Sequence, residues 1–392
     1  MISFEQAYAL VTDKLPLPEV EQVPLAESRG RVLATDIQSD MCMPPFNKAA
    51  VDGFACRRED LGDESLQLLE VIAAGKVPVH RIGKGQCAKI MTGAMMPEGA
   101  DCIVMVEQSE MLAGERVRIA DKRTKDNIAR MGEDIRRGDI VLKQGCLIKP
   151  QHMAVLASVG AHHPHVYKQV KVCVMSTGDE LVEPHLVPGK GQIRNSNATQ
   201  LLAQADAMGL VVNYGGIIAD NEPDCRRMIT DGLRNNDVLI LSGGISMGDF
   251  DYIPAILDEL GLKIQFRSIA VQPGKPTVFS RSGNKFVFAL PGNPVSSFNI
   301  FELLAKPFMY RLMGLRWEAP VLRLPMAESY ERKSVSRLGF VPSIITADGK
   351  VKPIHYHGSA HINALTDANA LMQVPLGKAV INIGDLVDVR LI

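Results

Sequence analysis

The sequence predicts an α/β multidomain protein with a central parallel sheet, a β-rich insert before it and a small β domain after it. Residues 170–313 alternate short apolar runs with helical patterns, which is typical of a parallel sheet covered by helices on both faces. Residues 43–137 contain short apolar runs broken by glycine and proline, which favour strands joined by turns. The last segment, residues 319–392, has strand patterns without a helical one.

The composition narrows the class of protein. The chain has 392 residues, of which 46% are apolar and 22% charged, and its formal net charge is −1. This length predicts about two to four domains. The near-zero charge argues against binding a nucleic acid or a membrane through bulk charge. The chain opens without a signal-peptide pattern, and its seven cysteines lie far apart, which favours reduced thiols in a cytoplasmic protein.

The individual helices and strands are predicted from the spacing of apolar residues and from the residues that begin or end such segments. Residues 4–15 form a short amphipathic pattern with Ser3 as the N-cap, and residues 150–160 return to a helical pattern. In the α/β part, strands are predicted at 170–175, 210–218, 238–241 and 286–290. Helices are predicted between and after them, at 197–208, 223–234, 252–260 and 295–313. Strand candidates in the last segment are 321–324, 350–354 and 386–391.

The most informative segment is residues 239–252, LILSGGISMGDFDY. An apolar run ends in a glycine-rich loop, which leads into Asp249, Asp251 and a helical pattern. Such a turn exposes backbone N–H groups and a helix N-terminus, which together hold an anion. The two carboxylates add ligands for a divalent cation. The combination indicates chemistry on a phosphorylated small molecule.

Two more loops leave predicted strands at the same edge of the sheet, residues 176–180 (STGDE) and residues 291–297 (PGNPVSS). Ligands of open parallel sheets bind beyond the carboxyl ends of the strands, so the three loops are expected to form one site. They supply close backbone approach, hydroxyls for phosphate and carboxylates for metal, and Lys275 adds a cation. The candidate ligand-binding residues are Ser176, Thr177, Gly178, Asp179, Ser242, Gly243, Gly244, Ser246, Gly248, Lys275, Pro291, Gly292, Asn293 and Pro294.

Simpler interpretations stand beside these. Each loop taken singly is also explained as a tight turn, and it is the convergence of three loops that favours a site. Asp52 and Thr92, taken alone, are explained as turn residues. Two groups of histidines are explained better as exposed residues than as metal ligands, namely His162, His163 and His165, and His355, His357 and His361.

Together the motifs resemble the MoeA-type molybdopterin molybdenumtransferases, a family that includes the C-terminal domain of gephyrin. The resemblance runs over essentially the whole chain. Its motifs are, in order, residues 44–55 (PPFNKAAVDGFA), 91–101 (MTGAMMPEGAD), 132–135 (GEDI), 176–181 (STGDEL), 242–252 (SGGISMGDFDY) and 291–297 (PGNPVSS). Gly358 and Ser359, followed by residues 363–365, are similar to the family's C-terminal domain.

The resemblance implies a fold and a domain organisation. It implies a discontinuous N-terminal and dimerisation domain (1–42 and 138–168), a β-rich insert (43–137), a Rossmann-like molybdopterin-binding domain (169–318) and a C-terminal domain resembling a β-barrel (319–392). It also implies an elongated homodimer whose site forms between domains of two subunits.

The implied reaction is a step of molybdenum cofactor biosynthesis. Adenylylated molybdopterin and molybdate are the substrates, Mg²⁺ is the cofactor, AMP is released, and a MogA-like adenylyltransferase is the partner that supplies the pterin. Cationic groups such as Lys275 and Arg130 would hold molybdate. The implied catalytic residues are Asp52, Thr92, Asp134, Glu180, Asp220 and Asp251, and Ser359 joins the ligand-binding set. Asp220, Asp251 and Glu180 are the expected metal ligands.

The chain departs from the family pattern at several positions. Ala129 lies where an arginine is common, and Gln272 lies where many members have a lysine. Residues 47–49 and Val51 also vary the early motif. These departures concern the molybdate pocket more than the pterin pocket.

Two alternatives therefore stay open. One is a catalytically weakened pterin-binding module or a gephyrin-like scaffold, which the loss of two cationic positions motivates. The other is an enzyme that makes the adenylylated intermediate, because that enzyme shares the loop at 242–244. The retained acidic residues argue against the first alternative, and the extra N-terminal and C-terminal domains argue against the second.

Overall fold

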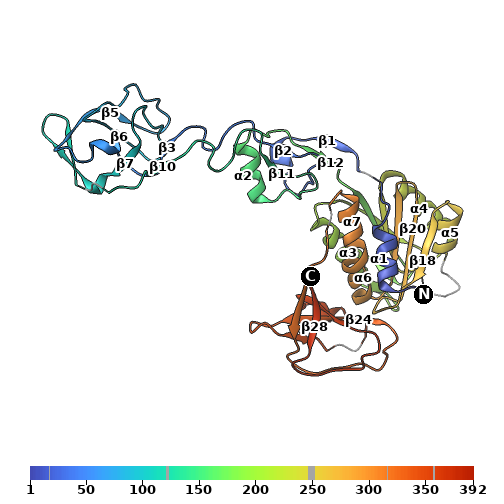
Figure 1. The fold of residues 1–392 in the computed structure, drawn as a ribbon. Coiled ribbons are helices and arrows are strands. Elements are labelled where there is room, and N and C mark those ends of the chain that lie inside the picture. Colours follow the sequence, from blue (N-terminus) through green and yellow to red (C-terminus); the bar gives the residue numbers. More distant parts are fainter. Residues whose placement is uncertain (17, 121–122, 246–251, 316, 356–357) are drawn as a thin grey trace.

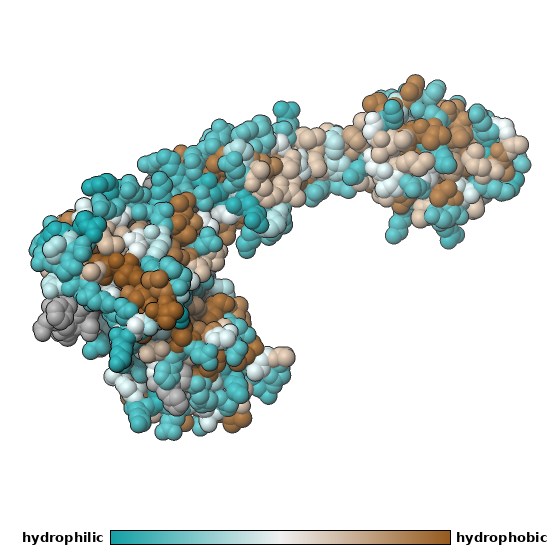
Figure 2. Space-filling view, turned by 180° about the vertical axis from the view of Figure 1, so that it is seen from behind, coloured by the Kyte–Doolittle hydropathy of each residue, from teal (hydrophilic) through white to brown (hydrophobic). Residues whose placement is uncertain are grey.

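The structure is a computed structural model that describes residues 1–392 apart from 17, 121–122, 246–251, 316 and 356–357. The molecule is elongated, with a β-rich lobe at one end and an α/β body with a C-terminal β region at the other (Figure 1). A narrow connecting region joins the two ends, and its thinness beside the lobe is clear in the space-filling view (Figure 2). Among the described residues, no helix is long and apolar enough to cross a membrane.

The α/β body is built on a six-stranded sheet with the order β16-β13-β17-β21-β20-β18. The four parallel strands, which confirm the predicted alternation, are β13 (Lys171–Thr177), β16 (Val211–Ile218), β17 (Val238–Ser242) and β21 (Lys285–Leu290). Strands β20 (Pro276–Ser282) and β18 (Lys263–Ser268) extend the sheet in the antiparallel sense. The sheet departs from the prediction at this edge because β20 and β21 form a hairpin around Gly283 and Asn284, a turn signal that the prediction missed.

Helices cover both faces of this sheet, as predicted. Alternate side chains of a strand point to opposite faces, and accordingly Val172 and Val174 pack in one core whereas Cys173 and Met175 pack in another. The first core includes residues of α1 (Phe4–Thr12), α3 (Ser196–Asp206), α6 (Pro294–Ile300) and α7 (Lys306–Leu312). The second core includes residues of α4 (Glu222–Asn235) and α5 (Ile253–Glu259).

Two helices show how local sequence sets their course. Helix α1 begins at a capping box, in which Ser3 Oγ accepts the Gln6 N–H at 3.1 Å and Gln6 Oε1 accepts the Ser3 N–H at 3.0 Å. This confirms the predicted N-cap. The predicted helix at 295–313 is instead divided by a π-helical turn, Phe301–Ala305, between α6 and α7. Pro307 accounts for the turn, because proline lacks an N–H and crowds the carbonyl four residues earlier.

The connecting region is small and has its own core. It contains α2 (Pro150–Ser158) and two strand pairs, β1 (Val20–Gln22) with β12 (His165–Tyr167) and β2 (Ile37–Gln38) with β11 (Ile140–Leu142). Its buried residues include Leu33, Ile148 and Leu156. The lobe is inserted in sequence between two parts of the connecting region. The chain therefore crosses from the connecting region to the lobe and back again, and these two segments attach the lobe.

We call residues 43–137 the distal lobe. Its main sheet has the order β7-β4-β6-β5-β9-β8, with β4 (Gly53–Cys56), β5 (Leu66–Ile72), β6 (Gln86–Ile90), β7 (Cys102–Met105), β8 (Ser109–Leu112) and β9 (Arg116–Ile119). A short pair, β3 (Lys48–Ala49) with β10 (Ile128–Ala129), lies beside it. Two small cores pack in the lobe, one around Phe54 and one around Ile90. The prediction of a β-rich insert is thus confirmed as to its secondary structure.

The C-terminal region is a β structure joined to the α/β body through one sheet. Its path is β19 (Val271–Gln272), β24 (Leu338–Ile345), β26 (Ala370–Val374), β28 (Leu386–Leu391) and β22 (Val321–Pro325), with β25 (Val351–Pro353) beside β24. Strand β23 (Tyr330–Glu331) pairs with β27 (Val380–Ile381). Since β19 comes from the α/β body, Gln272 lies where the two regions meet.

Candidate functional site

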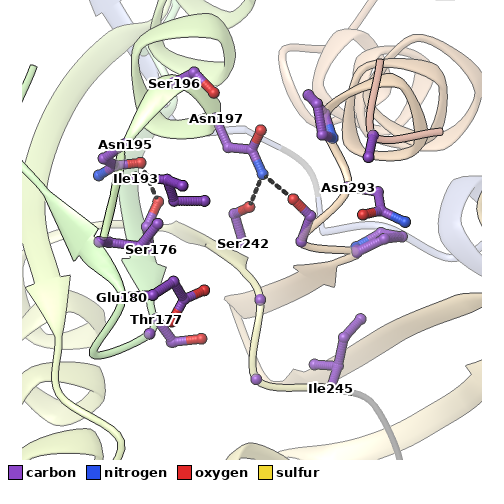
Figure 3. A pocket seen from close by; sticks show the side chains of 18 of the residues that line it. Ser176, Thr177, Glu180, Ile193, Asn195, Ser196, Asn197, Ser242, Ile245 and Asn293 are labelled. Atoms are coloured by element: carbon purple, nitrogen blue, oxygen red, sulfur yellow. Dashed lines mark hydrogen bonds between the residues drawn. The ribbon is translucent and has the colours of Figure 1, made fainter. Parts of the chain in front are cut away.

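The carboxyl ends of three parallel strands meet at one cavity. In the sheet, Ser176 is opposite Ser242 and Ser242 is opposite Leu290, so the three predicted loops start side by side. The cavity has a volume of about 510 Å³ (Figure 3). Twelve of the predicted residues line it: Ser176, Thr177, Gly178, Glu180, Asp220, Ser242, Gly243, Gly244, Pro291, Gly292, Asn293 and Pro294.

The second loop runs unusually close to the first. Gly243 and Gly244 have φ angles of +95° and +64°, and a Cβ on either would lie 2.8 Å from Thr177 Oγ1. Side chains other than glycine's are therefore excluded at both positions by strain and by contact. The Thr177 hydroxyl is buried and has no hydrogen-bond partner among the described residues. A buried hydroxyl that lines a cavity in this state is suited to bind a polar ligand group.

The acidic residues of the site are partly organised. Asp179 Oδ1 accepts the Asp220 N–H at 3.0 Å, and Asp220 Oδ2 accepts the Asp179 N–H at 3.4 Å. Asp220 and Glu180 line the cavity, whereas Asp179 does not. Ionised carboxylates accept several further bonds, and hard oxygen ligands are those that Mg²⁺ prefers. Asp220 and Glu180 therefore fit a magnesium ion chemically.

Several predicted residues lie outside the described part of the chain, namely Ser246, Gly248, Asp249, Asp251 and His357. The predicted metal trio of Asp220, Asp251 and Glu180 stays a prediction for this reason. Within the described residues, no three or more His, Cys, Asp or Glu side chains gather into a metal-binding group.

A second cavity of about 510 Å³ adjoins the first and shares Pro276, Pro291 and Asn293 with it. Lys275 and Ser359 line this second cavity and not the first. Asn293 Nδ2 donates to Ser359 Oγ at 2.9 Å, and the Ser359 carbonyl accepts the Val295 N–H at 3.1 Å. Ser359 thus connects the C-terminal region to the third loop.

The second cavity carries more positive than negative charge. It is lined by Lys275, Arg332 and Arg337, with Glu331 as the acidic residue, and Gln272 also lines it. Arg332 is only 9% exposed, and its guanidinium donates to the carbonyls of three residues, Arg337, Pro375 and Lys378. Burial lowers the pKa of Arg332. Gln272 Oε1 is buried without a hydrogen-bond partner among the described residues.

The remaining predicted residues, Asp52, Thr92 and Asp134, belong to the distal lobe, which lies at the other end of the molecule from the α/β body (Figure 1). Asp52 Oδ1 accepts the N–H of Thr92 at 2.6 Å and its hydroxyl at 2.7 Å. These bonds hold the pKa of Asp52 below its usual value, and the backbone N–H has the larger effect. Asp134 is exposed, and its N–H donates to the Met43 carbonyl. One chain therefore does not bring these three residues to the loops.

Arg130 is also in the distal lobe, apart from the Lys275 of its own chain, so the prediction that both hold one anion stays a prediction. Its guanidinium donates to Asp126 Oδ2 at 2.8 Å, and its N–H donates to Glu133. The reason is topological, because Arg130 follows β10 in the lobe whereas Lys275 precedes β20 in the α/β body.

Three of the cavity residues that the prediction missed lie at the start of α3, namely Asn195, Ser196 and Asn197. Asn195 is the N-cap of α3, where its Oδ1 accepts the Ala198 N–H at 3.2 Å. The signal was present in the sequence, because an asparagine just before a predicted helix marks an N-terminus that points along the sheet toward the strands' carboxyl ends.

Comparison with known proteins identifies the family of this chain. Residues 2–160 match the model of the MoeA N-terminal region (domains I and II), and residues 173–311 match that of a probable molybdopterin binding domain. Residues 324–392 match the model of the MoeA C-terminal region (domain IV). The three models follow one another in the order expected for the family.

Similar proteins cover nearly the whole chain. A molybdopterin molybdenumtransferase of Staphylococcus epidermidis is 36% identical over 94% of this chain and 90% of its own length. Another from Haemophilus influenzae is 33% identical over 100% of this chain and 98% of its own length. The crystal structure of a molybdopterin biosynthesis MoeA protein from a Pyrococcus species has a TM-score of 0.84, with 29% identity over 100% of this chain and 99% of that one. The chain therefore belongs to the MoeA family of molybdopterin molybdenumtransferases, and it is a transferase of molybdenum cofactor biosynthesis.

Proposed function

We propose that this enzyme inserts molybdenum from molybdate into adenylylated molybdopterin and releases AMP. The observation that carries the proposal is the cavity where three loops from neighbouring strands meet, with hydroxyls, close-packed glycines and two carboxylates around it. Breaking a phosphoanhydride needs stabilisation of the negative charge that develops on the phosphates. Oriented N–H groups, hydroxyls and a cation supply that stabilisation.

The first cavity is the proposed place for the pterin phosphate and the phosphoanhydride. The buried Thr177 hydroxyl would donate to a phosphate oxygen, and the glycines at 243 and 244 let the ligand approach the backbone closely. Mg²⁺ would be held by Asp220, Glu180 and Asp251, where it neutralises phosphate charge when bound. The other predicted residues that line this cavity, such as Ser176, Ser242 and Asn293, would bind and orient the pterin.

The adjoining second cavity is the proposed place for molybdate. Molybdate is an anion, and Lys275 and Arg337 supply positive charge beside the Ser359 hydroxyl. The cavity shares Asn293 with the first one, which brings the metal oxyanion close to the pterin site. Gln272 leaves this cavity with less positive charge than a lysine there would give.

We further propose that the distal lobe acts on a second subunit. Asp52, Thr92 and Asp134 would complete the cavity of a partner in a homodimer, because they cannot reach the cavity of their own chain in this structure. This proposal keeps the four-domain division given by the resemblance, a cytoplasmic location and a MogA-like adenylyltransferase as the supplier of the pterin. The match to the MoeA N-terminal and C-terminal models favours insertion over adenylylation as this chain's own step.

A single-turnover experiment tests the proposal. The purified protein is mixed with adenylylated molybdopterin, Mg²⁺ and molybdate, and AMP release and the activation of an apo-molybdoenzyme are followed. We expect AMP release that depends on molybdate and yields active cofactor. Tight pterin binding with no AMP release would contradict the proposal and favour the pterin-binding scaffold, with Ala129 and Gln272 as the residues to examine.

A further inference from the structure

The first turn of α3 connects the three loops of the first cavity. Asn195 Oδ1 accepts the hydroxyl of Ser176 in the first loop at 2.8 Å. Two residues later, Asn197 Nδ2 donates to Ser242 Oγ at 2.8 Å and to the Gly292 carbonyl at 2.7 Å (Figure 3). One amide thus bonds the second and third loops at once. Asn197 is buried, with 9% of its surface exposed, and Ser242 is 2% exposed.

The chemistry of the partners settles how the Asn197 amide is oriented. The Gly292 carbonyl only accepts hydrogen bonds, so the amide group that faces it must be the NH₂. Both hydrogens of that NH₂ are then used, one for each loop. An aspartate of the same shape would present an oxygen to the Gly292 carbonyl and would lose both donated bonds. The Ser242 hydroxyl could then turn its hydrogen toward the carboxylate and away from the ligand.

The bond from Asn197 also sets the direction of the Ser242 hydroxyl. A serine hydroxyl has one hydrogen and can accept through its lone pairs. Because Asn197 donates to Ser242 Oγ, the hydroxyl hydrogen has to point away from α3. Ser242 lines the cavity, and its hydrogen joins that of Thr177 as a donor for an anionic ligand.

We propose that Asn197 is a positioning residue for the phosphate part of the pterin substrate. It holds the second loop against the third and turns the Ser242 hydroxyl toward the ligand, without itself taking part in the reaction. The two loops are direct neighbours here, since a Cβ on Gly292 would lie in ordinary van der Waals contact with the Gly243 Cα, at 3.8 Å. This inference rests on the proposed function of the same cavity and adds the residue that assembles it.

The same helix offers a matched control outside the cavity. Gln200 lies on α3 and does not line the first cavity. Gln200→Glu adds the same charge through the same change of an amide to a carboxylate. Only Asn197→Asp also loses the two bonds donated to the second and third loops, so a difference between the two variants reports those lost donors.

The test is made on the full chain with molybdopterin as the probe in equilibrium binding and adenylylated molybdopterin in steady-state kinetics. For Asn197→Asp we expect Kd and KM to rise roughly 10- to 100-fold, because losing donors to buried partners costs one to two tenfold steps. Gln200→Glu should stay within about threefold of the wild type. Bonds kept from ground state to transition state change KM more than kcat, so kcat should fall by less than about threefold.

Other outcomes are equally informative. A purely structural role would lower kcat through a smaller folded fraction and leave KM unchanged, and that result would overturn the inference, as would equal Kd values for the two variants. If Asn197→Asp does not fold, Asn197→Ser keeps one donor and should give an intermediate Kd, with Gln200→Ala on the same helix as the control. No molybdopterin binding by the wild type would instead contradict the proposed function.

Discussion

The α/β body and the distal lobe hold the predicted site residues in different ways. In the body, loops whose strands end 66 and 48 residues apart in sequence lie together because they leave neighbouring parallel strands, as the register of Ser176, Ser242 and Leu290 shows. Asp52 and Thr92 are bonded to each other, but they belong to the lobe, which lies at the other end of the molecule from the body (Figure 1). Sheet topology determines where the loops of one sheet lie, so these positions can be predicted from the order of the strands. No local sequence pattern determines where one domain lies relative to another.

The largest effect is expected for a change that closes the gap between two loops of the body. Gly243→Ala places a Cβ 2.8 Å from the Thr177 carbonyl and hydroxyl oxygens at a φ of +95°, so we expect kcat/KM to fall by about 10²-fold or more. Gly261→Ala is the control, because Gly261 also has a positive φ (+75°) but has no atom within 4 Å of the added Cβ. Equal activity of the two variants would show that the close approach of Gly243 to Thr177 is not needed for activity.

The next prediction asks whether the lobe serves a second subunit. Asp52→Asn and Asp220→Asn should each lower activity, the first by about tenfold and the second by about 10²-fold. Unfolding and refolding the two variants together should restore roughly one quarter of the wild-type activity, because half of the dimers are hybrids with one intact site.

That recovery separates two arrangements of the site. If both residues served the cavity of their own chain, each hybrid subunit would carry one lesion, and mixing would restore nothing. Mixing Gly243→Ala with Asp220→Asn is the control, since both changes lie in the body and should not complement each other.

A smaller effect is expected where the body meets the C-terminal region. Gln272→Lys adds a cation beside Lys275 and Arg337, so we expect molybdate to bind about three- to tenfold more tightly. The apparent affinity is measured from the molybdate dependence of AMP release. Gln169→Lys, at an exposed position of the body, controls for net charge, and the same affinity in both variants would remove Gln272 from the molybdate pocket.

The smallest effect concerns the Asp52 carboxyl in the lobe. Its pKa is depressed by the Thr92 bonds, so the bond stabilises the fold above the ordinary Asp pKa of about 3.9, and that stability is lost as the pH falls through the lowered value. In Thr92→Ala the hydroxyl bond is gone but the N–H bond remains, and the pKa should rise part of the way. Carboxyl NMR titration measures it, with Asp348 and its Thr346 bond as the unchanged internal control.

Sequence patterns predicted the α/β body well because each of its features has a local cause. Strand and helix periodicities located β13, β16, β17 and β21, and the loops at their ends were assigned to one site by the rule for parallel sheets. The π-helical turn and the β20–β21 hairpin also have local signals, Pro307 and the turn at Gly283, but the prediction did not include either feature. Strand β24 was missed because Pro342 lies in its middle, where a proline argues against a strand.

Other features had no local signal. The bonds from Asn197 to the second and third loops join residues 45 and 95 positions apart, which no periodicity reveals. The separation of Asp52, Thr92 and Asp134 from the cavity depends on how far the connecting region carries the lobe. Sequence motifs therefore proposed which residues form the site, and the three-dimensional structure showed that those residues lie in two separate regions of one chain.

The location of bound pterin is the most direct test of the central claim, that the three loops of the α/β body form the substrate site. We would determine a crystal structure of the full chain with molybdopterin. We predict that its phosphate lies within hydrogen-bond distance of the Thr177 and Ser242 hydroxyls, beside Gly243. A phosphate bound elsewhere, on the distal lobe or in the second cavity alone, would contradict that claim.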